Sequence, residues 1–502
     1  MKRILLLALG TGLSACASIG TVATFEPDAE VPEVVSSAPD TFMAANVSEI
    51  ESSESANWWR IFNDPVLDQI VGTAQSQNFD IQEAAARLQQ ANAAARQTAS
   101  AQGPTVTGAF NTSFSDSPLA GTGFGGFGGG GSDRLQIETV TPSLGASYEL
   151  DLFGRTLNDT EASKNDAIAA FFDVKTIRQS AVNEAIRTYF EIVDIQAQIA
   201  LQEDIIDLIA ERVASTESRF SRGLAESFEL YQLDQDLRSL RASIPQQKSA
   251  LEQAKIRLAL ILGEYRPQTH ERLATTLAPQ LSFNAVATPQ PITVLEQRPD
   301  VQAAWARAEA ARRRIGARKA ERFPNLSFSA SLGSQGANLS QAIDVLDNWT
   351  LSLAQNLGGT IFDNGRAKAS IEAAEGIYAE RLATYAETVV RAHGEVEAAL
   401  EDFRYQTERY QLISSQLRAA QNSFDTQRRR FERGNGSYTS VLDAQRSVLQ
   451  TRSALASSGK DLALARLGIH RALGGDWGFE RPEDPTQDNI TTASLSAVPV
   501  EG

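Results

Sequence analysis

Few side chains in this sequence could carry out covalent or metal chemistry. The 502 residues include three histidines, His270, His393 and His470, which lie too far apart in the chain to match the spacing of a metal-binding motif. There is also no phosphate-binding glycine loop and no nucleophile motif. Acidic residues outnumber basic ones by 62 to 46, and a net charge of −16 argues against a nucleic-acid surface. The sequence therefore predicts a protein that is not an enzyme, has no cofactor or metal and binds no nucleic acid.

Cys16 is the one cysteine in the chain, so it cannot form an internal disulfide. It follows two basic residues and an apolar run that is too short to span a membrane, which are the features of a secretory signal. Residues 13–16, Leu-Ser-Ala-Cys, resemble the bacterial lipobox. We therefore expect a lipoprotein signal peptide at residues 1–15, with Cys16 as the lipid-modified first residue of the mature protein. The alternative is an ordinary signal peptide with an incidental cysteine.

The segments at the two ends of the chain are polar and are expected to lie outside the folded body. Ala17, rather than an aspartate, follows the cysteine, and by resemblance to bacterial lipoproteins this favours the outer membrane. Residues 16–55 are expected to form a lipid-anchored tether and extended N-terminal segment. Residues 476–502, which contain "EDPTQDN" and scattered Ser and Thr, are expected to be a disordered tail.

The body of the chain is internally duplicated. "RFSRG" at 219–223 returns as "RFERG" at 430–434, and the pairs Gly154-Arg155 and Leu262-Gly263 return at the same offset of 211 residues. Further upstream, "DIQEAAAR" at 80 matches "DVQAAWAR" at 300 with an offset of 220. The glycine tract at 121–131 lies in the interval where the offset changes, and it is expected to form a surface loop. The sequence predicts a first repeat at 56–264, beginning with short helices, and a second at 265–475.

Each repeat contains two long segments with an apolar residue at every seventh position, which is the spacing of a coiled-coil seam. The segment from 155 to 222 has no Pro or Gly, and as a helix it would be roughly 100 Å long. We expect antiparallel helical hairpins at 155–263 and 365–474, which reverse at the repeated phrases, where glycine permits the turn. The second-repeat seam consists of Leu382, Val389, Val396, Phe403, Tyr410, Leu417, Phe424 and Phe431, and then Val441, Val448, Leu455, Leu462 and Ile469.

Beyond the end of each long helix that is opposite the hairpin turn, the spacing of apolar residues changes from seven to two. "SLGASYELDLF" from Ser143, "LSFSASL" from Leu326 and "WTLSLAQNL" from Trp349 alternate between apolar and polar residues, and "VTGAFNTSF" from Val106 does so more loosely. The sequence predicts strand hairpins at 104–153 and 324–360. In a lipoprotein sent outward, strands of this length favour a transmembrane β-barrel. The alternative is a pair of exposed hairpins packed on their own helices.

Four strands are too few to close a barrel, because single-chain outer-membrane barrels begin at about eight strands. Open sheet edges in lipid would leave backbone groups without hydrogen bonds. The expected fold is therefore mixed, with four barrel strands and long antiparallel coiled-coil helices per chain, and with the barrel closed by several copies of the chain.

The motifs together resemble the outer membrane efflux protein family, the TolC-like channels, and specifically their lipoprotein branch. The resemblance rests on the lipobox, the duplicated unit, "FGR" and "NGR" at the start of each long helix, "QRPDVQAA" at 297–304 and "RFERGNGSYTSVLDAQRS" at 430–447, and it covers residues from about 55 to 475. It implies a homotrimer with a twelve-stranded barrel and a periplasmic helical tunnel. The channel would pass drugs or other small molecules from an inner-membrane RND-type pump and a periplasmic adaptor, a membrane fusion protein, across the outer membrane of a Gram-negative bacterium.

The resemblance also assigns roles to residues at the hairpin turns. The adaptor is expected to dock at Arg222, Gly223 and Leu224 in the first repeat and at Arg433, Gly434 and Asn435 in the second. The aperture gate is expected to contain Glu229, Phe431, Asp443 and Arg446. Arg446 follows Asp443 by three residues, so it can reach Asp443 on the same helix or an acid such as Glu229 on the adjacent hairpin. The alternative is that these are ordinary exposed charges of a helix face.

Two other functions remain compatible with the sequence. A channel of this kind could serve type I protein secretion beside an ATP-driven exporter, although the lipid anchor favours drug efflux. A lipid-anchored periplasmic coiled-coil scaffold without a pore is the other possibility, and the strand alternation argues against it.

Overall fold

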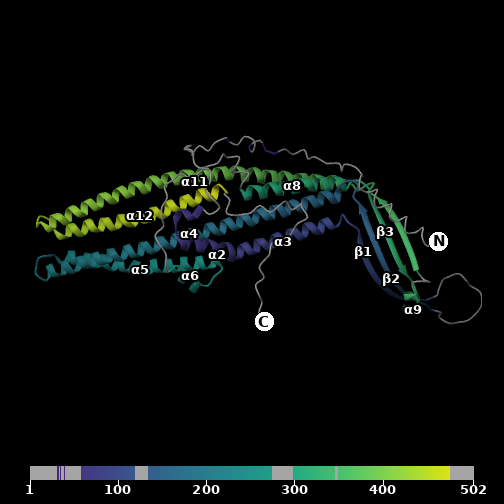
Figure 1. The fold of residues 1–502 in the computed structure, drawn as a ribbon, viewed down its shortest axis with the longest axis horizontal. Helices are drawn as coiled ribbons and strands as arrows, with labels where there is room; N and C mark the ends of the chain where they lie inside the picture. The colour runs from purple at the N-terminus through teal and green to yellow at the C-terminus, as the bar shows by residue number, and fades with distance from the viewer. Residues whose placement is uncertain are drawn as a thin grey trace, which may run out of the picture. The chain divides into compact units, whose positions relative to one another are not determined.

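The computed structural model describes residues 58–118, 134–273, 298–344 and 349–474, together with positions 31, 32, 34 and 39. The signal peptide, Cys16, the tether to residue 55 apart from those four positions, the glycine tract at 121–131 and the tail at 476–502 lie outside these described residues. The elements, most of which are labelled in Figure 1, are η2 Trp58–Phe62, α2 Pro65–Gln77, α3 Phe79–Ser100, β1 Thr105–Pro118, β2 Arg134–Leu150, α4 Arg155–Phe220, α5 Ser227–Leu262, α6 Arg266–Arg272, α8 Pro299–Ala320, β3 Asn325–Ser334, α9 Leu339–Ile343, β4 Trp349–Gly358, α11 Arg366–Glu432 and α12 Tyr438–Ala472.

The elements divide into two compact units that cut across the sequence repeats. Of the described residues, the sheet unit includes 85–118, 134–173, 303–344 and 349–388, and the helical unit includes 58–84, 174–273, 298–302 and 389–474. Each unit therefore takes segments from both repeats. The long helices α4 and α11 contribute to both units, since the unit boundaries fall at 173 and 388.

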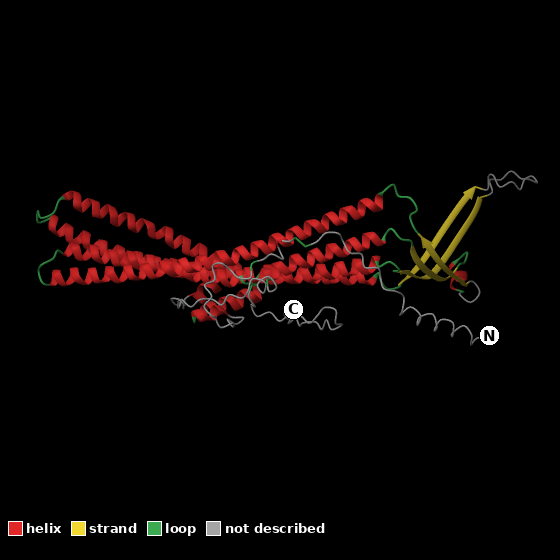
Figure 2. Cartoon of the chain, turned by 90° about the horizontal axis from the view of Figure 1, so that it is seen from above, coloured by secondary structure: helices red, strands yellow, loops and turns green. Residues whose placement is uncertain are grey.

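The sheet unit contains one four-stranded antiparallel sheet in the order β1-β2-β3-β4. Figure 2 shows the strands in yellow. In the register of the sheet, Leu144 pairs with Leu332 and Leu332 pairs with Leu351, while Leu150 pairs with Leu326 and Leu326 with Leu357. Because side chains alternate along a strand, these rows lie on one face of the sheet. The adjacent rows, such as Ser147–Ser329–Ala354 and Gly145–Ser331–Ser352, lie on the other face and are small or polar.

The helices of the sheet unit pack through small residues. Ala308, Ala311 and Ile315 of α8 form a buried cluster with Ala374, Tyr378 and Leu382 of α11. The first turns of α4 also pack closely on α8, since a Cβ at Gly316 would come within 2.9 Å of the Asn158 side chain. Arg307 and Arg314 of α8 form ion pairs with Asp173 and Asp166 of α4. Leu382 is the first residue of the predicted second-repeat seam, and it is buried in this cluster.

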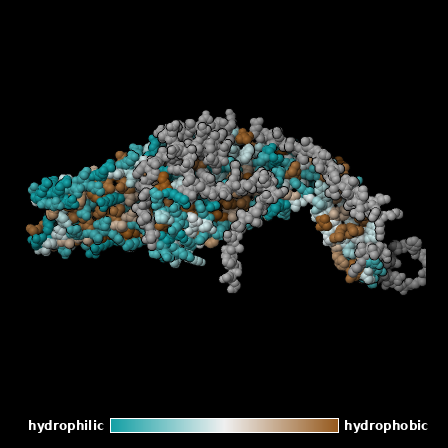
Figure 3. Space-filling view, viewed as in Figure 1, coloured by the Kyte–Doolittle hydropathy of each residue, from teal (hydrophilic) through white to brown (hydrophobic). Residues whose placement is uncertain are grey.

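In the helical unit, α4 and α5 form one antiparallel hairpin and α11 and α12 form the other. Figure 3 shows apolar residues between the two hairpins and hydrophilic residues over their outer surfaces. One apolar cluster joins η2 and α2 to α4, α5 and α12, and a second, nearer the turns, joins Ile205 and Ile209 of α4 to Leu237 of α5 and Leu442 of α12. The exposure of the seam rises toward the turn, from buried Val396 to half-exposed Phe431.

A buried polar contact fixes the short α2 on the long α4. Asp64 caps the N-terminus of α2 by accepting hydrogen bonds from the backbone N–H groups of Val66 and Leu67 at 2.9 and 3.3 Å. Its second carboxylate oxygen accepts a hydrogen bond from the hydroxyl of Tyr189 on α4. Burial and the adjacent Asp64 carboxylate raise the pKa of Tyr189, so the phenol stays protonated and continues to donate.

Within the described ranges, no helix combines the length and the apolar character that crossing a bilayer requires.

Candidate functional site

The two hairpin turns lie 211 residues apart in the chain and have the same backbone structure. At the first turn, the N–H of Gly223 donates to the carbonyl of Phe220, and the N–H of Leu224 donates to the carbonyl of Arg219 at 2.9 Å. At the second turn, Gly434 and Asn435 make the equivalent bonds to Phe431 and Arg430. Paired bonds of this kind define a Schellman cap, and they require a left-handed residue at the glycine position. The φ angles of Gly223 and Gly434 are +71° and +75°.

The turns present exposed side chains at the end of the helical unit. Leu224 is 62% exposed, although it is apolar. Arg222 folds back on α4, where its Nε donates to the carbonyl of Ser218 at 2.9 Å. Arg433 and Asn435 are exposed at the second turn. All six residues predicted to contact an adaptor therefore lie on the surface of these two turns or in their backbone caps.

An ion pair links the two hairpins close to the turns. Nη1 of Arg212 on α4 lies 2.5 Å from Oδ1 of Asp443 on α12. The Arg212 side chain is 19% exposed and that of Asp443 is 57% exposed, so the pair sits at the edge of the apolar cluster that contains Ile209 and Leu442. One turn nearer the hairpin tip, the hydroxyl of Tyr438 donates to Oε1 of Glu211. This hydrogen bond, together with partial burial, raises the pKa of Tyr438.

The predicted gate residues do not all come together in the chain. Asp443 is paired with Arg212, whereas the sequence suggested Arg446 as its partner, with an acid such as Glu229 as the alternative partner of Arg446. Arg446 is half-buried three residues further along α12, and its Nε has no hydrogen-bond partner among the described residues. Within the same described residues, Glu229 on the first turn of α5 forms no ion pair. The Phe431 ring lies 5.3 Å from the ring of Tyr438 across the second turn.

The sequence reasoning missed three residues of this link: Glu211, Arg212 and Tyr438. Glu211 and Arg212 lie in the long segment of the first repeat, outside every motif that the sequence analysis used. Tyr438 lies inside the motif at 430–447 and could have been singled out as the aromatic residue next to the turn. Among the described residues, no group of acidic, histidine or cysteine side chains could hold a metal ion.

Comparison with known proteins gives a consistent result. The sequence profile described as outer membrane efflux protein matches residues 70–264 and 291–475. The chain is 26% identical over 485 residues to the pyoverdine export outer membrane protein OpmQ of Pseudomonas aeruginosa, covering 96% of this chain and 98% of that protein. It is 26% identical to the cation efflux system protein CusC of Escherichia coli O6:H1, covering 86% and 90%. The solved structure of the outer-membrane channel OprN matches with a TM-score of 0.80 at 26% identity, covering 91% of this chain and all of OprN.

Proposed function

The chain belongs to the outer membrane efflux protein family, and from that premise we propose that it forms the outer-membrane exit duct of a tripartite efflux system. In this proposal an inner-membrane RND-type pump and a periplasmic adaptor deliver drugs or other small molecules to the duct. Proteins of this family are channels in the outer membrane of Gram-negative bacteria, so the chain is a transport protein and not an enzyme. The names of the relatives describe export of pyoverdine and efflux of cations, which supports a small-molecule cargo.

The observation that carries the membrane part of this proposal is the sheet. Its apolar rows run across all four strands, yet their side chains are exposed: Val106 is 71% exposed and Leu353 is 75% exposed. Exposing a continuous apolar face that spans four strands to water is unfavourable. A lipid bilayer on this face and an aqueous lumen on the polar face would satisfy both surfaces.

The free edges of the sheet support a trimer. Among the described residues, β1 and β4 each pair with a strand on one side only, so each leaves a row of backbone N–H and C=O groups for another partner. Closing the edges of one chain against those of its neighbours would satisfy these groups in the bilayer. Three copies of a four-stranded sheet would form the twelve-stranded barrel that the family resemblance implies.

The ion pair between Arg212 and Asp443 supports a gate at the periplasmic end of the duct. It joins the two hairpins of one chain, with the hydrogen bond between Tyr438 and Glu211 beside it. In a symmetric trimer each link would occur three times around the aperture, so all three would resist the outward movement of the hairpins. We place Phe431 and Arg446 in the same gate, since both lie within one or two turns of this link. Glu229 belongs to the proposed gate through its position at the first turn of α5.

The adaptor would act on this gate from the hairpin turns. Arg222, Gly223 and Leu224 form one docking surface, and Arg433, Gly434 and Asn435 form the other. The backbone around each glycine is open, because a Cβ placed on Gly223 or Gly434 would meet no atom within 4 Å. An adaptor can therefore approach the backbone closely at both turns, and its binding would draw the hairpins apart.

The test of the proposed function combines transport and conductance. The chain would be expressed with candidate adaptor and RND-type pump pairs in cells that lack their own outer-membrane duct, and drug resistance would be scored. Purified protein would be examined by single-channel recording in planar bilayers.

Restored resistance with a measurable pore supports the exit duct. A pore that restores secretion of a protein toxin beside an ATP-driven exporter, but never drug resistance, would instead indicate type I secretion. Absence of any conductance would overturn the channel and favour a scaffold.

We propose that Cys16, outside the described residues, carries the lipid but is not required for pore assembly. The reason is that a closed barrel holds itself in the bilayer through its own apolar belt. Cys16→Ser behind an ordinary signal peptide should lose lipid labelling with radioactive palmitate and still give trimers in the outer membrane. Complete loss of membrane trimers in this variant would count against the barrel.

A further inference from the structure

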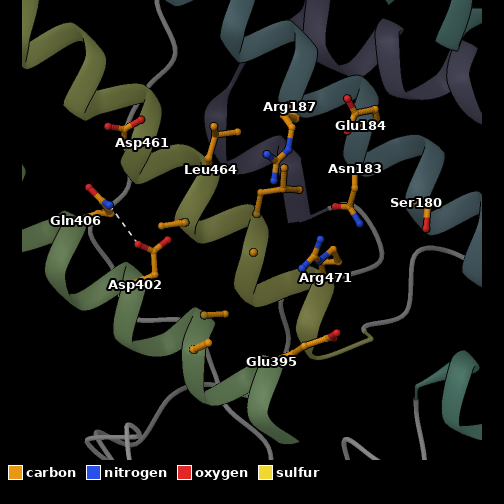
Figure 4. A pocket seen from close by; sticks show the side chains of 15 residues that line it. Ser180, Asn183, Glu184, Arg187, Glu395, Asp402, Gln406, Asp461, Leu464 and Arg471 are labelled. Carbon is orange, nitrogen blue, oxygen red and sulfur yellow. Dashed lines mark hydrogen bonds between the residues drawn. The ribbon is translucent and has the colours of Figure 1, made fainter. Parts of the chain in front are cut away.

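The helical unit contains a pocket that the proposed duct and gate do not use. Its walls are formed by α4, α11 and α12, far along the helices from the turns, and its volume is about 710 Å³. Figure 4 shows the side chains that line it. A cavity of this size is in the range that holds a small organic molecule. All of its lining residues belong to the same compact unit.

One side of the pocket carries two cations without ionic partners. Arg187 of α4 and Arg471 of α12 line the cavity, and neither forms an ion pair with any described residue. Asn183 of α4 lines the same pocket, and Figure 4 shows the side chains of all three residues on the cavity wall. The backbone at Arg471 is held against α4, because Nε2 of Gln179 donates to the carbonyl of Arg471 at 3.3 Å. Gln179, Asn183 and Arg187 share one face of α4 at a spacing of four residues.

The amide of Asn183 makes no hydrogen bond to any residue that the structure describes. The residue is 7% exposed, and both its Nδ2 and its Oδ1 are buried without a partner among the described residues. Leaving a buried amide unpaired costs free energy, and such a group calls for an explanation. Because Asn183 lines the pocket beside two arginines, a ligand atom that accepts hydrogen bonds would satisfy its Nδ2. A carboxylate has the geometry to accept from two guanidinium groups and an amide together.

The opposite side of the pocket is acidic. Glu395 is paired with Arg298 at 2.8 Å, and Asp461 is paired with Arg409 at 2.9 Å and with Lys460 at 3.5 Å. Asp402 accepts one hydrogen bond, from Nε2 of Gln406 at 3.1 Å, and forms no ion pair with a described residue. In Figure 4 it lies across the cavity from Asn183. Glu184 also lines the pocket, beside the arginines on α4. The negative charge of Glu184 disfavours the binding of a dianion such as phosphate more strongly than the binding of a ligand with a single carboxylate.

From this arrangement we propose that the pocket binds a zwitterionic small molecule that carries one carboxylate and one ammonium group. The carboxylate accepts from Arg187, Arg471 and Nδ2 of Asn183. The ammonium group lies toward Asp402, which is the acid on that side without an ion pair of its own. The inference concerns binding alone and does not depend on the proposed efflux function, because binding is measurable in the purified protein without pump or adaptor.

The experiment compares three probes of matched length at neutral pH: 6-aminohexanoate, hexanoate and hexylamine. Binding to the purified full-length protein in detergent would be measured by saturation-transfer NMR titration. The zwitterion should bind roughly tenfold more tightly than either singly charged probe, since it alone makes both sets of charged hydrogen bonds. Equal binding of all three probes, or no binding of the zwitterion, would overturn the proposal.

Variants separate the two ends of the site. Arg471→Gln should weaken 6-aminohexanoate and hexanoate roughly tenfold and leave hexylamine unchanged. Asp402→Asn should weaken 6-aminohexanoate and hexylamine and leave hexanoate unchanged. Arg418→Gln, at an exposed arginine of α11 outside the pocket, is the matched control and should change no probe. The assignment of the two ends is refuted if Arg471→Gln and Arg418→Gln have the same effect.

Asn183→Leu distinguishes a binding role from a structural one. Because the amide makes no hydrogen bond to a described residue, replacing it with an apolar group of similar volume should not lower the temperature of thermal unfolding in the absence of a probe. The same variant should weaken the two carboxylate probes. A large loss of stability with unchanged probe binding would show that Asn183 is a structural residue and would remove it from the site.

Discussion

At the scale of single residues, the contact that matters most for the proposed gate is the one between Arg212 and Asp443. The pair lies between helices of different hairpins, and Asp443 is more than half exposed, so each copy contributes on the order of 1 kcal/mol or less. Three symmetric copies would break together. We expect Arg212→Ala and Asp443→Ala to raise single-channel conductance and to sensitise cells to vancomycin, with trimer yield unchanged.

The double variant Arg212→Ala/Asp443→Ala should open the channel no further than either single variant, because both remove the same contact. Arg452→Gln serves as the control, since Arg452 is an exposed residue of the same helix that lies outside the proposed gate and forms no ion pair with a described residue. If Arg446→Gln opened the channel while Arg212→Ala left it closed, the gate would depend on a contact between neighbouring subunits instead.

A second residue-scale prediction concerns acid stability. Nη2 of Arg298, at the start of α8, lies 2.7 Å from Asp300 and 2.8 Å from Glu395, and its Nη1 donates to the carbonyl of Ala472 at the end of α12. Burial raises the pKa of Asp300, but the ion pair with Arg298 outweighs it and lowers this pKa below the ordinary value of 3.8. A carboxyl with a lowered pKa stabilises the fold above 3.8 and loses that contribution as the pH falls below it.

Thermal unfolding should therefore become easier for the native chain between pH 4.5 and pH 2.5, and Asp300→Asn should show a shallower decline over the same range. Asp234→Asn is a suitable control, because its ion pair with Arg238 is exposed and within one helix. An identical pH dependence in the native chain and in Asp300→Asn would show that other carboxyls account for the acid sensitivity.

At the scale of elements, the glycines that end the helices differ in what surrounds them. Gly223 and Gly263 both end helices of the first hairpin, with φ angles of +71° and +67°. A Cβ on Gly223 would meet no atom, whereas a Cβ on Gly263 would lie 2.6 Å from the carbonyl oxygen of Gln77. Both substitutions with alanine cost about 1 kcal/mol for the left-handed backbone. Only Gly263→Ala must also displace the end of α2.

We therefore expect Gly263→Ala to reduce the free energy of unfolding by clearly more than Gly223→Ala, and Gly223→Ala to act mainly on adaptor binding. Gly474 and Gly434 offer the same comparison in the second repeat, since a Cβ on Gly474 would lie 2.6 Å from Cγ of Arg298 and one on Gly434 would meet nothing. Urea unfolding of the four variants measures their loss of stability. Adaptor binding, measured in parallel, tests whether the glycines at the hairpin turns act mainly on docking. Equal losses of stability across the four would contradict this account.

At the scale of the whole molecule, the two faces of the sheet should differ in their tolerance of charge. Leu353 pairs with Ala330 on the apolar face, and the adjacent Ser352 pairs with Ser331 on the polar face. If the apolar face meets lipid, Leu353→Arg should destabilise the assembled barrel by roughly 2–4 kcal/mol, while Ser352→Arg should be tolerated in the lumen. The amount of heat-modifiable trimer in outer-membrane fractions is the measurement. The opposite order of effects would place lipid on the other face.

The sequence alone was enough to locate the long helices and the four strands, because both depend on the local period of apolar residues. The seven-residue seams correspond to α4, α5, α11 and α12, and the two-residue alternation corresponds to the four strands. Chain reversal at the repeated phrases was also readable, since a glycine that follows a long helix indicates a left-handed cap. The family could be recognised from motifs that are each contiguous in the chain.

The side chains that meet across these elements could be identified only in the folded chain. Arg212 and Asp443 are 231 residues apart, and their contact depends on how α12 lies along α4, which no local period specifies. The same holds for the pocket, where Asn183, Asp402 and Arg471 come from three helices. The compact units likewise cut across both repeats, because long helices pack on spatial neighbours and not on sequence neighbours. A charged side chain can lie at any exposed position of a helix, so the apolar period of the sequence does not predict its partner. The packing of the helices alone determines which charges meet.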